Sequence, residues 1–159
     1  MKSNYENVLE FHETFGVATP DKPLNKICDT DKKLLEFRIS LIEEELNELK
    51  DAIKNKDFVE IVDALGDISY VVNGFGAVLG VDMDKAFNLI HSSNMTKACE
   101  TEQEAIDTCI SISQRPDKLY TPSYRKSNGK FVVFDTNTGK ILKSKYYTPV
   151  DLKCFDNSV

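Results

Sequence analysis

Two long segments with helical periodicity, joined by a short polar link, constrain the fold of this chain most strongly. Apolar residues recur every three to four positions from residue 31 to about 55, and again from 58 to about 79. Asp57, at the end of the link, is a suitable N-cap for the second segment. A link this short predicts that the two helices are antiparallel neighbours.

Other segments with helical periodicity flank this pair, namely residues 4–16, 82–93 and 101–113. The intervening residues 17–29 include Pro20 and Pro23 and are predicted to form a loop. We therefore expect an all-α fold, an antiparallel bundle of four to five helices.

The C-terminal part of the chain has a different pattern. After residue 113, apolar and polar residues begin to alternate, as is typical of strands. Residues 130–134 and 140–143 predict a β-hairpin whose turn contains Gly139. We expect a helical domain at 1–113, followed at 114–159 by a small C-terminal β-hairpin appendage and tail.

The composition argues against several functional classes. The 26 acidic residues outnumber the 20 basic ones, so the net charge of −6 provides no basic surface for nucleic acid. No run approaches the roughly 18 apolar residues of a membrane span, and the N-terminus lacks the apolar stretch of a signal peptide. We expect a cytoplasmic protein that binds neither nucleic acid nor membrane.

Carboxylates gather on one side of each long predicted helix. They are Glu44, Glu45 and Glu48 in the first helix, and Glu60, Asp63 and Asp67 in the second. A solvated acidic face is one interpretation. If the two sets converge at the helix interface, their pKa values must rise unless a cation neutralises them. Oxygen ligands alone favour Mg²⁺, with Mn²⁺ as the alternative, over zinc.

The acidic segments of the two long predicted helices also resemble a known family. Glu44-Glu45-x-x-Glu48 followed by Asp63-Ala-Leu-Gly-Asp67 resembles the EExxE…ExxD pattern of the MazG-like all-α nucleoside-triphosphate pyrophosphohydrolases. That superfamily includes the phosphoribosyl-ATP pyrophosphohydrolases and the dimeric dUTPases. The strings Phe11-His12-x-x-Phe15-Gly16 and His91-Ser-Ser-Asn94-Met-Thr-Lys97 are similar to the phosphoribosyl-ATP pyrophosphohydrolase-like branch, found among phage and other viral proteins.

The resemblance implies a Mg²⁺-dependent hydrolase that cleaves a (deoxy)nucleoside triphosphate or related nucleotide between its α- and β-phosphates, giving the monophosphate and pyrophosphate. The implied catalytic residues are Glu44, Glu45 and Glu48, and the implied metal ligands are Glu45, Glu48, Asp63 and Asp67. Glu44 would orient or deprotonate the attacking water. Ala64 stands where the pattern expects Glu, so Asp63, or Glu60 together with Asp63, would take that role.

Substrate-binding residues are expected on both sides of this cluster. Asn94 and Lys97 would present an amide and an ammonium to a phosphate, with His91 nearby, although a solvated helix end would show the same spacing. On the other side His12, Tyr70 and Asn73 would contact the sugar or base. Phe15, which could also wall a base pocket, is expected to belong to the core.

Two alternatives to this function remain open. The substrate could be phosphoribosyl-ATP or dUTP, or the chain could be a non-catalytic helical nucleotide-binding or interaction protein. Ala64 is the feature that favours the non-catalytic alternative. Apolar residues occur all around the second long helix, which predicts subunit packing in a homodimer or homotetramer.

Overall fold

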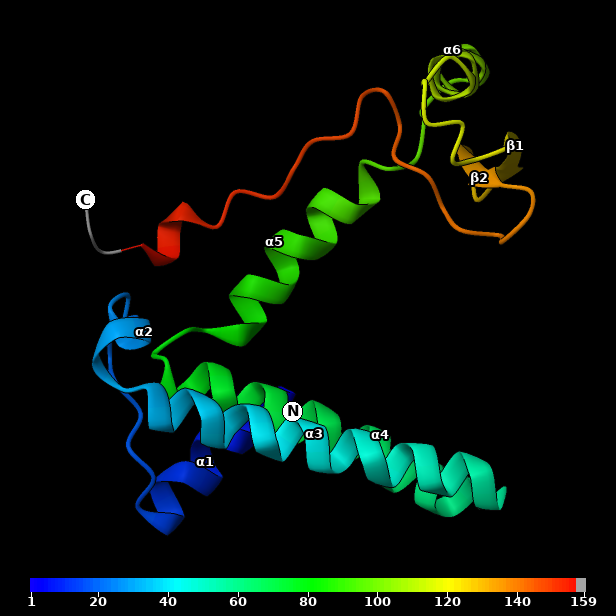
Figure 1. Cartoon of the computed structure of the whole chain (residues 1–159). Helices are drawn as coiled ribbons and strands as arrows, with labels where there is room; N and C mark the ends of the chain where they lie inside the picture. Colours follow the sequence, from blue (N-terminus) through cyan, green and yellow to red (C-terminus); the bar gives the residue numbers. More distant parts are fainter. Residues whose placement is uncertain (157–159) are drawn as a thin grey trace. The chain divides into compact units, whose positions relative to one another are not determined.

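A pair of long antiparallel helices forms the body of the computed structural model, which describes residues 1–156. These are α3 (Lys32–Asn55) and α4 (Phe58–Val78), packed along their length (Figure 1). Carboxylate caps fix both starts: Asp31 accepts a hydrogen bond from the backbone N–H of Leu34, and Asp57 accepts from the N–H groups of Val59 and Glu60. The predicted helix pair is confirmed.

A third helix packs against α4. It is α1 (Asn4–Phe15), which begins with a capping box between Ser3 and Glu6 and ends at Gly16 in the left-handed conformation. The predicted loop that follows contains one short helix, α2 (Ile27–Thr30). The predominance of helix, with one small antiparallel sheet near the C-terminus, confirms the predicted fold class.

The chain divides into two compact units, and the division differs from the predicted one. The first contains residues 1–87 and the C-terminal segment from Leu152, and the second contains residues 88–151. The boundary therefore falls inside α5 (Met83–Met95) instead of after residue 113. The correction has a physical reason, which is that α6 (Glu102–Ser113) shares its core with the hairpin rather than with the helix pair.

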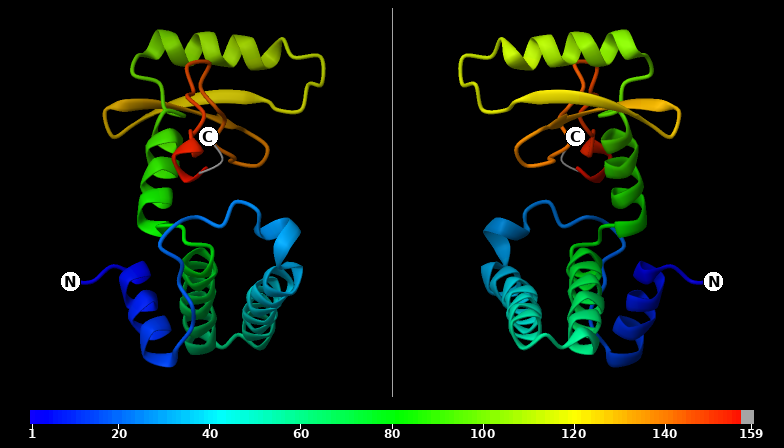
Figure 2. Two further views of the ribbon diagram at one scale, coloured as in Figure 1. Left: turned by 90° about the vertical axis from the view of Figure 1, so that its left-hand side faces the viewer. Right: turned by 90° about the vertical axis from the view of Figure 1, so that its right-hand side faces the viewer.

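The second unit is a small core between α6 and a two-stranded sheet (Figure 2). The strands are β1 (Pro122–Ser127) and β2 (Lys130–Asp135), paired antiparallel. The core consists of the buried residues Cys99, Ala105, Ile112, Val133 and Leu142. This unit therefore has its own apolar centre.

The hairpin has a different partner strand from the one predicted. The strand at 130–135 pairs with 122–127, through a two-residue turn at Asn128-Gly129. Both turn residues have positive φ, 50° and 81°, as the tight turns favoured in hairpins require. The predicted strand at 140–143 is wrong: Ile141 forms only an isolated bridge with Phe134.

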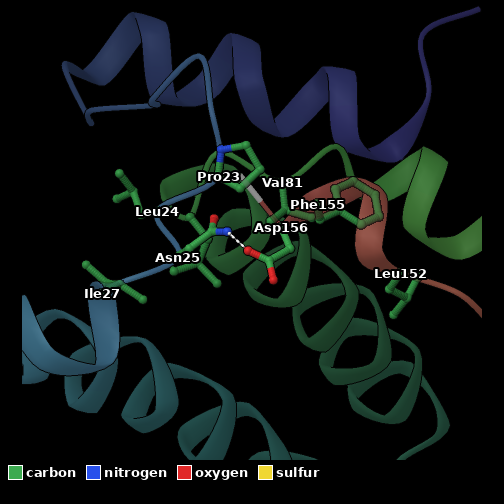
Figure 3. A pocket seen from close by; sticks show the side chains of 9 residues that line it. Pro23, Leu24, Asn25, Ile27, Val81, Leu152, Phe155 and Asp156 are labelled. Atoms are coloured by element: carbon green, nitrogen blue, oxygen red, sulfur yellow. Dashed lines mark hydrogen bonds between the residues drawn. The ribbon is translucent and has the colours of Figure 1, made fainter. Parts of the chain in front are cut away.

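The C-terminal segment closes one side of a cavity in the first unit. The short helix η1 (Lys153–Phe155) faces the α1–α2 loop across a cavity of about 430 Å³ (Figure 3). Asn25 donates a hydrogen bond to the carboxylate of Asp156 at 2.6 Å, and the Lys85 ammonium lies 5.4 Å from the ring centroid of Phe155. The lining is mostly apolar, so this cavity does not supply the predicted carboxylate chemistry.

Helix α4 is unusually apolar for a helix with exposed side chains. By length and composition alone it could cross a membrane, although the sequence was predicted to contain no such segment, and core helices of globular proteins have the same properties. Its exposed apolar residues include Phe58, Val62 and Leu65, with exposures of 75%, 54% and 53%. They follow helical spacing, so they form one stripe, which we call the α4 stripe.

Candidate active site

Carboxylates from α3 and α4 converge around Glu45. The pKa of Glu45 is raised first by burial and then by the negative charges of Glu48, Asp67, Glu44 and Asp63. All the charged groups that shift this pKa are carboxylates. The five carboxylates expected from the sequence to catalyse or to bind metal are therefore close enough for the charges of the other four to act on Glu45.

An unpartnered oxygen lies in the middle of this group. Glu45 Oε2 is buried and accepts no hydrogen bond. Buried polar atoms without a partner are rare in folded proteins, and each requires an explanation. A divalent cation would accept this lone pair and relieve the repulsion among the surrounding carboxylates.

The side chains do not form a closed metal cage. Within residues 1–156, no three His, Cys, Asp or Glu side chains are gathered closely enough to hold a metal ion. The donor set, which is all oxygen with one buried unpartnered atom, nevertheless fits Mg²⁺ or Mn²⁺ in its chemistry.

Ala64, where the family pattern expects Glu, lies at a helix interface. Ala64 is only 3% exposed, so a glutamate side chain would have to be buried there. Its neighbour Asp63 is close enough to raise the pKa of Glu45. Glu60 lies one turn earlier on α4 and is not among the groups that shift the pKa of Glu45, so its participation with Asp63 stays a prediction.

The aromatic residues of α1 are distributed differently from the prediction. Phe15 is 67% exposed, so its assignment to the core is wrong, whereas His12 is 3% exposed and takes the core position. Phe11 lies 4.3 Å from Phe15 and 5.7 Å from Tyr70 between ring centroids. The exposed aromatic surface made by Phe11, Phe15 and Tyr70 is available for stacking.

Tyr70 and Asn73 line one cavity between α1 and α4. It has a volume of about 220 Å³ and includes Asn4, Asn7 and Ser69 in its wall. Asn73 donates a hydrogen bond from Nδ2 to the carbonyl oxygen of Ser69 at 2.8 Å, which leaves its carbonyl oxygen to accept. Of the three residues expected to contact sugar or base, Tyr70 and Asn73 therefore share a concave surface, whereas the buried His12 is not among the residues that line it.

The other predicted substrate-binding residues belong to the second unit. His91 and Asn94 are exposed on α5, and Lys97 is half-buried beyond its end. Lys97 lines a cavity of about 340 Å³ with Arg115, Lys140 and Lys143. Half of its eight lining residues are cations and none is an acid, so this surface suits a phosphate.

The sequence reasoning missed Arg38. Its guanidinium is half-buried on α3, and its Nε is buried without a hydrogen-bond partner. Arg38 precedes Glu45 by seven residues, which places both on one face of the helix. The seven-residue spacing could have indicated that Arg38 belongs to the site. However, a cationic residue among the many charged residues of α3 is also typical of an ordinary exposed helix face.

Comparisons with known proteins agree with this arrangement. A helical body with carboxylates on two antiparallel helices is the arrangement that the resemblance to the MazG-like pyrophosphohydrolases implies. The family model described as phosphoribosyl-ATP pyrophosphohydrolase matches residues 8–94, more than half of the chain. The chain belongs to the phosphoribosyl-ATP pyrophosphohydrolase family, within the MazG-like superfamily.

The family match covers most of α1, the whole of α2, α3 and α4, and most of α5. The chain is also similar to an uncharacterized protein of Acanthamoeba polyphaga mimivirus, with 26% identity. That alignment covers 91% of this chain and 92% of the viral protein, so the similarity extends beyond the residues of the family match into the second unit. Membership of the family supports a pyrophosphohydrolase type of activity in general.

Proposed function

We propose that the protein is a Mg²⁺-dependent nucleotide pyrophosphohydrolase that cleaves a (deoxy)nucleoside triphosphate, or a related nucleotide, between its α- and β-phosphates. The observation that carries the proposal is Glu45, whose buried, unpartnered oxygen lies among four further carboxylates. The family match supports the class of reaction, and the donor chemistry supports the metal.

Each carboxylate has a role in this proposal. Glu45, Glu48, Asp63 and Asp67 would hold Mg²⁺, which neutralises the charge on the phosphate oxygens when it is bound. Glu44 is exposed and remains close to Glu45. It would orient the attacking water and accept its proton as the bond to the α-phosphorus forms, while pyrophosphate leaves.

The rest of the substrate would bind on surfaces beside the carboxylates. The exposed Phe11 and Tyr70 supply aromatic faces for a base, and Asn73 supplies a hydrogen-bonding amide. The second unit contains Asn94, Lys97 and His91, for which phosphate binding is proposed separately, on the cationic surface that Lys97 lines. The choice of base, including the phosphoribosyl-ATP and dUTP alternatives, depends on contacts that a substrate panel must identify.

We also propose that the active form is a homodimer or homotetramer. The α4 stripe exposes Phe58, Val62 and Leu65 to solvent in one protomer. Contiguous apolar surface of this kind is typical of subunit interfaces. A second copy of the chain would cover it.

A substrate panel tests the proposed function. The native protein is incubated with Mg²⁺ and each canonical nucleoside triphosphate, dUTP or phosphoribosyl-ATP, and pyrophosphate and monophosphate are measured. We expect one or more substrates to give both products in equal amounts, and EDTA to abolish the reaction. Absence of pyrophosphate from all substrates would favour the non-catalytic alternative.

A further inference from the structure

Positive charge is concentrated in the second unit, although the whole chain is acidic. Residues 88–151 contain nine Lys and Arg against seven Asp and Glu, whereas the other residues contain eleven against nineteen. The acidic excess of the chain therefore lies entirely outside the second unit. Such an asymmetry favours an anionic ligand for the second unit.

Four of these cations line a single cavity of about 340 Å³. They are Lys97, Arg115, Lys140 and Lys143, and the other lining residues are Tyr120 and three aliphatic side chains. The cations come from three separate segments, which follow α5, α6 and β2, and all four lie beyond the family match at residues 8–94. None of the eight lining residues is an acid. We call this site the cationic cavity.

The charges of the cationic cavity are not neutralised by carboxylates of the described chain. Residues 1–156 contain two ion pairs, and neither includes a residue of the cavity. Acids of the second unit are engaged elsewhere: Glu100 pairs with Lys130, and Glu102 accepts a hydrogen bond from the Tyr124 hydroxyl at 3.0 Å. Four like charges therefore face one space, and a bound anion would relieve their mutual repulsion.

Two of the lysines are held by aromatic rings instead of carboxylates. Lys140 Nζ donates a hydrogen bond to the Tyr120 hydroxyl at 3.1 Å and lies 5.2 Å from the centroid of that ring. Lys143 Nζ lies 4.6 Å from the ring centroid of the half-buried Tyr147. A cation–π contact restrains an ammonium without cancelling its charge. These two side chains are therefore partly ordered before an anion binds, which lowers the entropic cost of binding.

We propose that the cationic cavity binds a metal-free chain of two or three linked phosphates, either as part of a nucleotide or as free pyrophosphate. A monophosphate carries a charge of about −2 at pH 7, so more than one phosphate is needed to match four cations. The role of Lys97 toward the substrate rests on the proposed function. The charge and volume of the cavity do not depend on hydrolysis.

The lining of the cavity also distinguishes this ligand from others. Without a carboxylate the cavity offers no hard ligand to Mg²⁺, and a metal bound to the phosphates would weaken their attraction to the cations. The carboxylates around Glu45 have the opposite requirement, because they would bind phosphates only through a cation. A concave site suits a small ligand, whereas single-stranded nucleic acid is bound along an extended basic groove.

Calorimetric titration of the full chain with inorganic pyrophosphate tests the proposal, once with EDTA and once with Mg²⁺ at equal ionic strength. We expect saturable binding in EDTA and weaker binding in Mg²⁺. Orthophosphate should bind at least about tenfold more weakly than pyrophosphate in EDTA. Pyrophosphate binding that requires Mg²⁺ would assign the ligand to the carboxylates and overturn the proposal.

A matched pair of double variants locates the binding. Lys140→Met with Lys143→Met removes two cations of the cavity and should weaken pyrophosphate binding in EDTA at least about tenfold. Lys126→Met with Lys145→Met removes two cations of the same unit that do not line the cavity, and should bind within about threefold of native. All four lysines are exposed, so both variants should unfold at the native temperature. Equal losses in both variants, or no loss in the first, would reject the cationic cavity as the site.

Further titrations in EDTA distinguish the sources of the phosphate chain. A nucleoside diphosphate or triphosphate that binds at least about tenfold more tightly than pyrophosphate would identify a nucleotide as the ligand. Equal binding would identify the phosphate chain alone. A single-stranded oligonucleotide that binds more tightly than all of these would contradict the choice of a small ligand.

The outcome also separates this inference from the proposed function. Metal-free pyrophosphate binding at the cavity, in a protein that releases no pyrophosphate from any nucleotide, would support the cavity and reject the hydrolase. Pyrophosphate release by a protein without metal-free binding would support the hydrolase and reject the cavity.

Discussion

Glu45→Gln should lower Mg²⁺-dependent pyrophosphate release by about 10²–10³-fold while making the metal-free protein more stable. Activity falls because the variant lacks the central carboxylate of the proposed metal site. Stability rises because the pKa of Glu45 is higher in the folded protein than in the unfolded chain, so its ionised form opposes folding above that pKa. Removing this charge should raise the metal-free Tm by about 2 °C.

Turnover and thermal unfolding are measured on the same preparations. Glu43→Gln is the matched control, because Glu43 is an exposed acid of the same helix and is absent from the charges that shift the pKa of Glu45. It should leave the rate within about threefold of native. A Glu45→Gln protein that keeps native turnover, or that is no more stable than native without metal, would contradict the role assigned to Glu45.

Leu65→Lys should dissociate the proposed oligomer. Leu65 lies in the α4 stripe and is 53% exposed in one protomer, so a second copy packed there would have to bury the new ammonium. An unpaired charge at the core of an interface costs several kcal/mol, which corresponds to at least about a hundredfold weaker association. Light scattering and analytical ultracentrifugation at several concentrations would measure the change.

Leu119→Lys is the control for that prediction, because Leu119 is 65% exposed but lies in the second unit, outside the α4 stripe. It should leave the oligomeric state unchanged. A native protein that is monomeric at all concentrations, or a Leu65→Lys protein that associates like native, would reject the α4 stripe as the interface.

The helix pair could be predicted because several local signals agree with its packing. The apolar periodicity, the Asp31 and Asp57 caps and the short link all require two antiparallel helices. The same geometry places Asp63 and Asp67 of α4 close enough to raise the pKa of Glu45 on α3, while the roles assigned to these carboxylates stay predictions. Here local sequence determines the tertiary arrangement almost directly.

The local sequence pattern does not determine which segments pair in the hairpin or where the boundary between the two units lies. Gly139 and Asn128-Gly129 are both turn signals, and the strand at 130–135 could have paired in either direction. Asp135 favours the turn at Asn128-Gly129 over a hairpin turn at Gly139. Its side chain accepts hydrogen bonds from the backbone N–H groups of Thr121 and Thr138, which fixes residues 136–138 as a turn beyond the sheet. The apolar face of α6 likewise gives no indication of which unit it joins.

The site was least predictable where burial decides the role of a residue. Phe15 and His12 share one helix, and hydrophobicity alone assigned the core to Phe15. In the structure His12 is buried because it lies against Gly74 and Arg38. These three residues are far apart in the sequence. Such a contact cannot be derived from the spacing within any single helix.

Hydrolysis in ¹⁸O-labelled water tests the central claim most directly. The native protein is given Mg²⁺ and a substrate identified by the panel, and the phosphorus-containing products are analysed by ³¹P NMR and mass spectrometry. Attack of water on the α-phosphorus predicts one labelled oxygen in the monophosphate and none in the released pyrophosphate. Label in pyrophosphate, or orthophosphate and a diphosphate as the products, would contradict the proposed reaction.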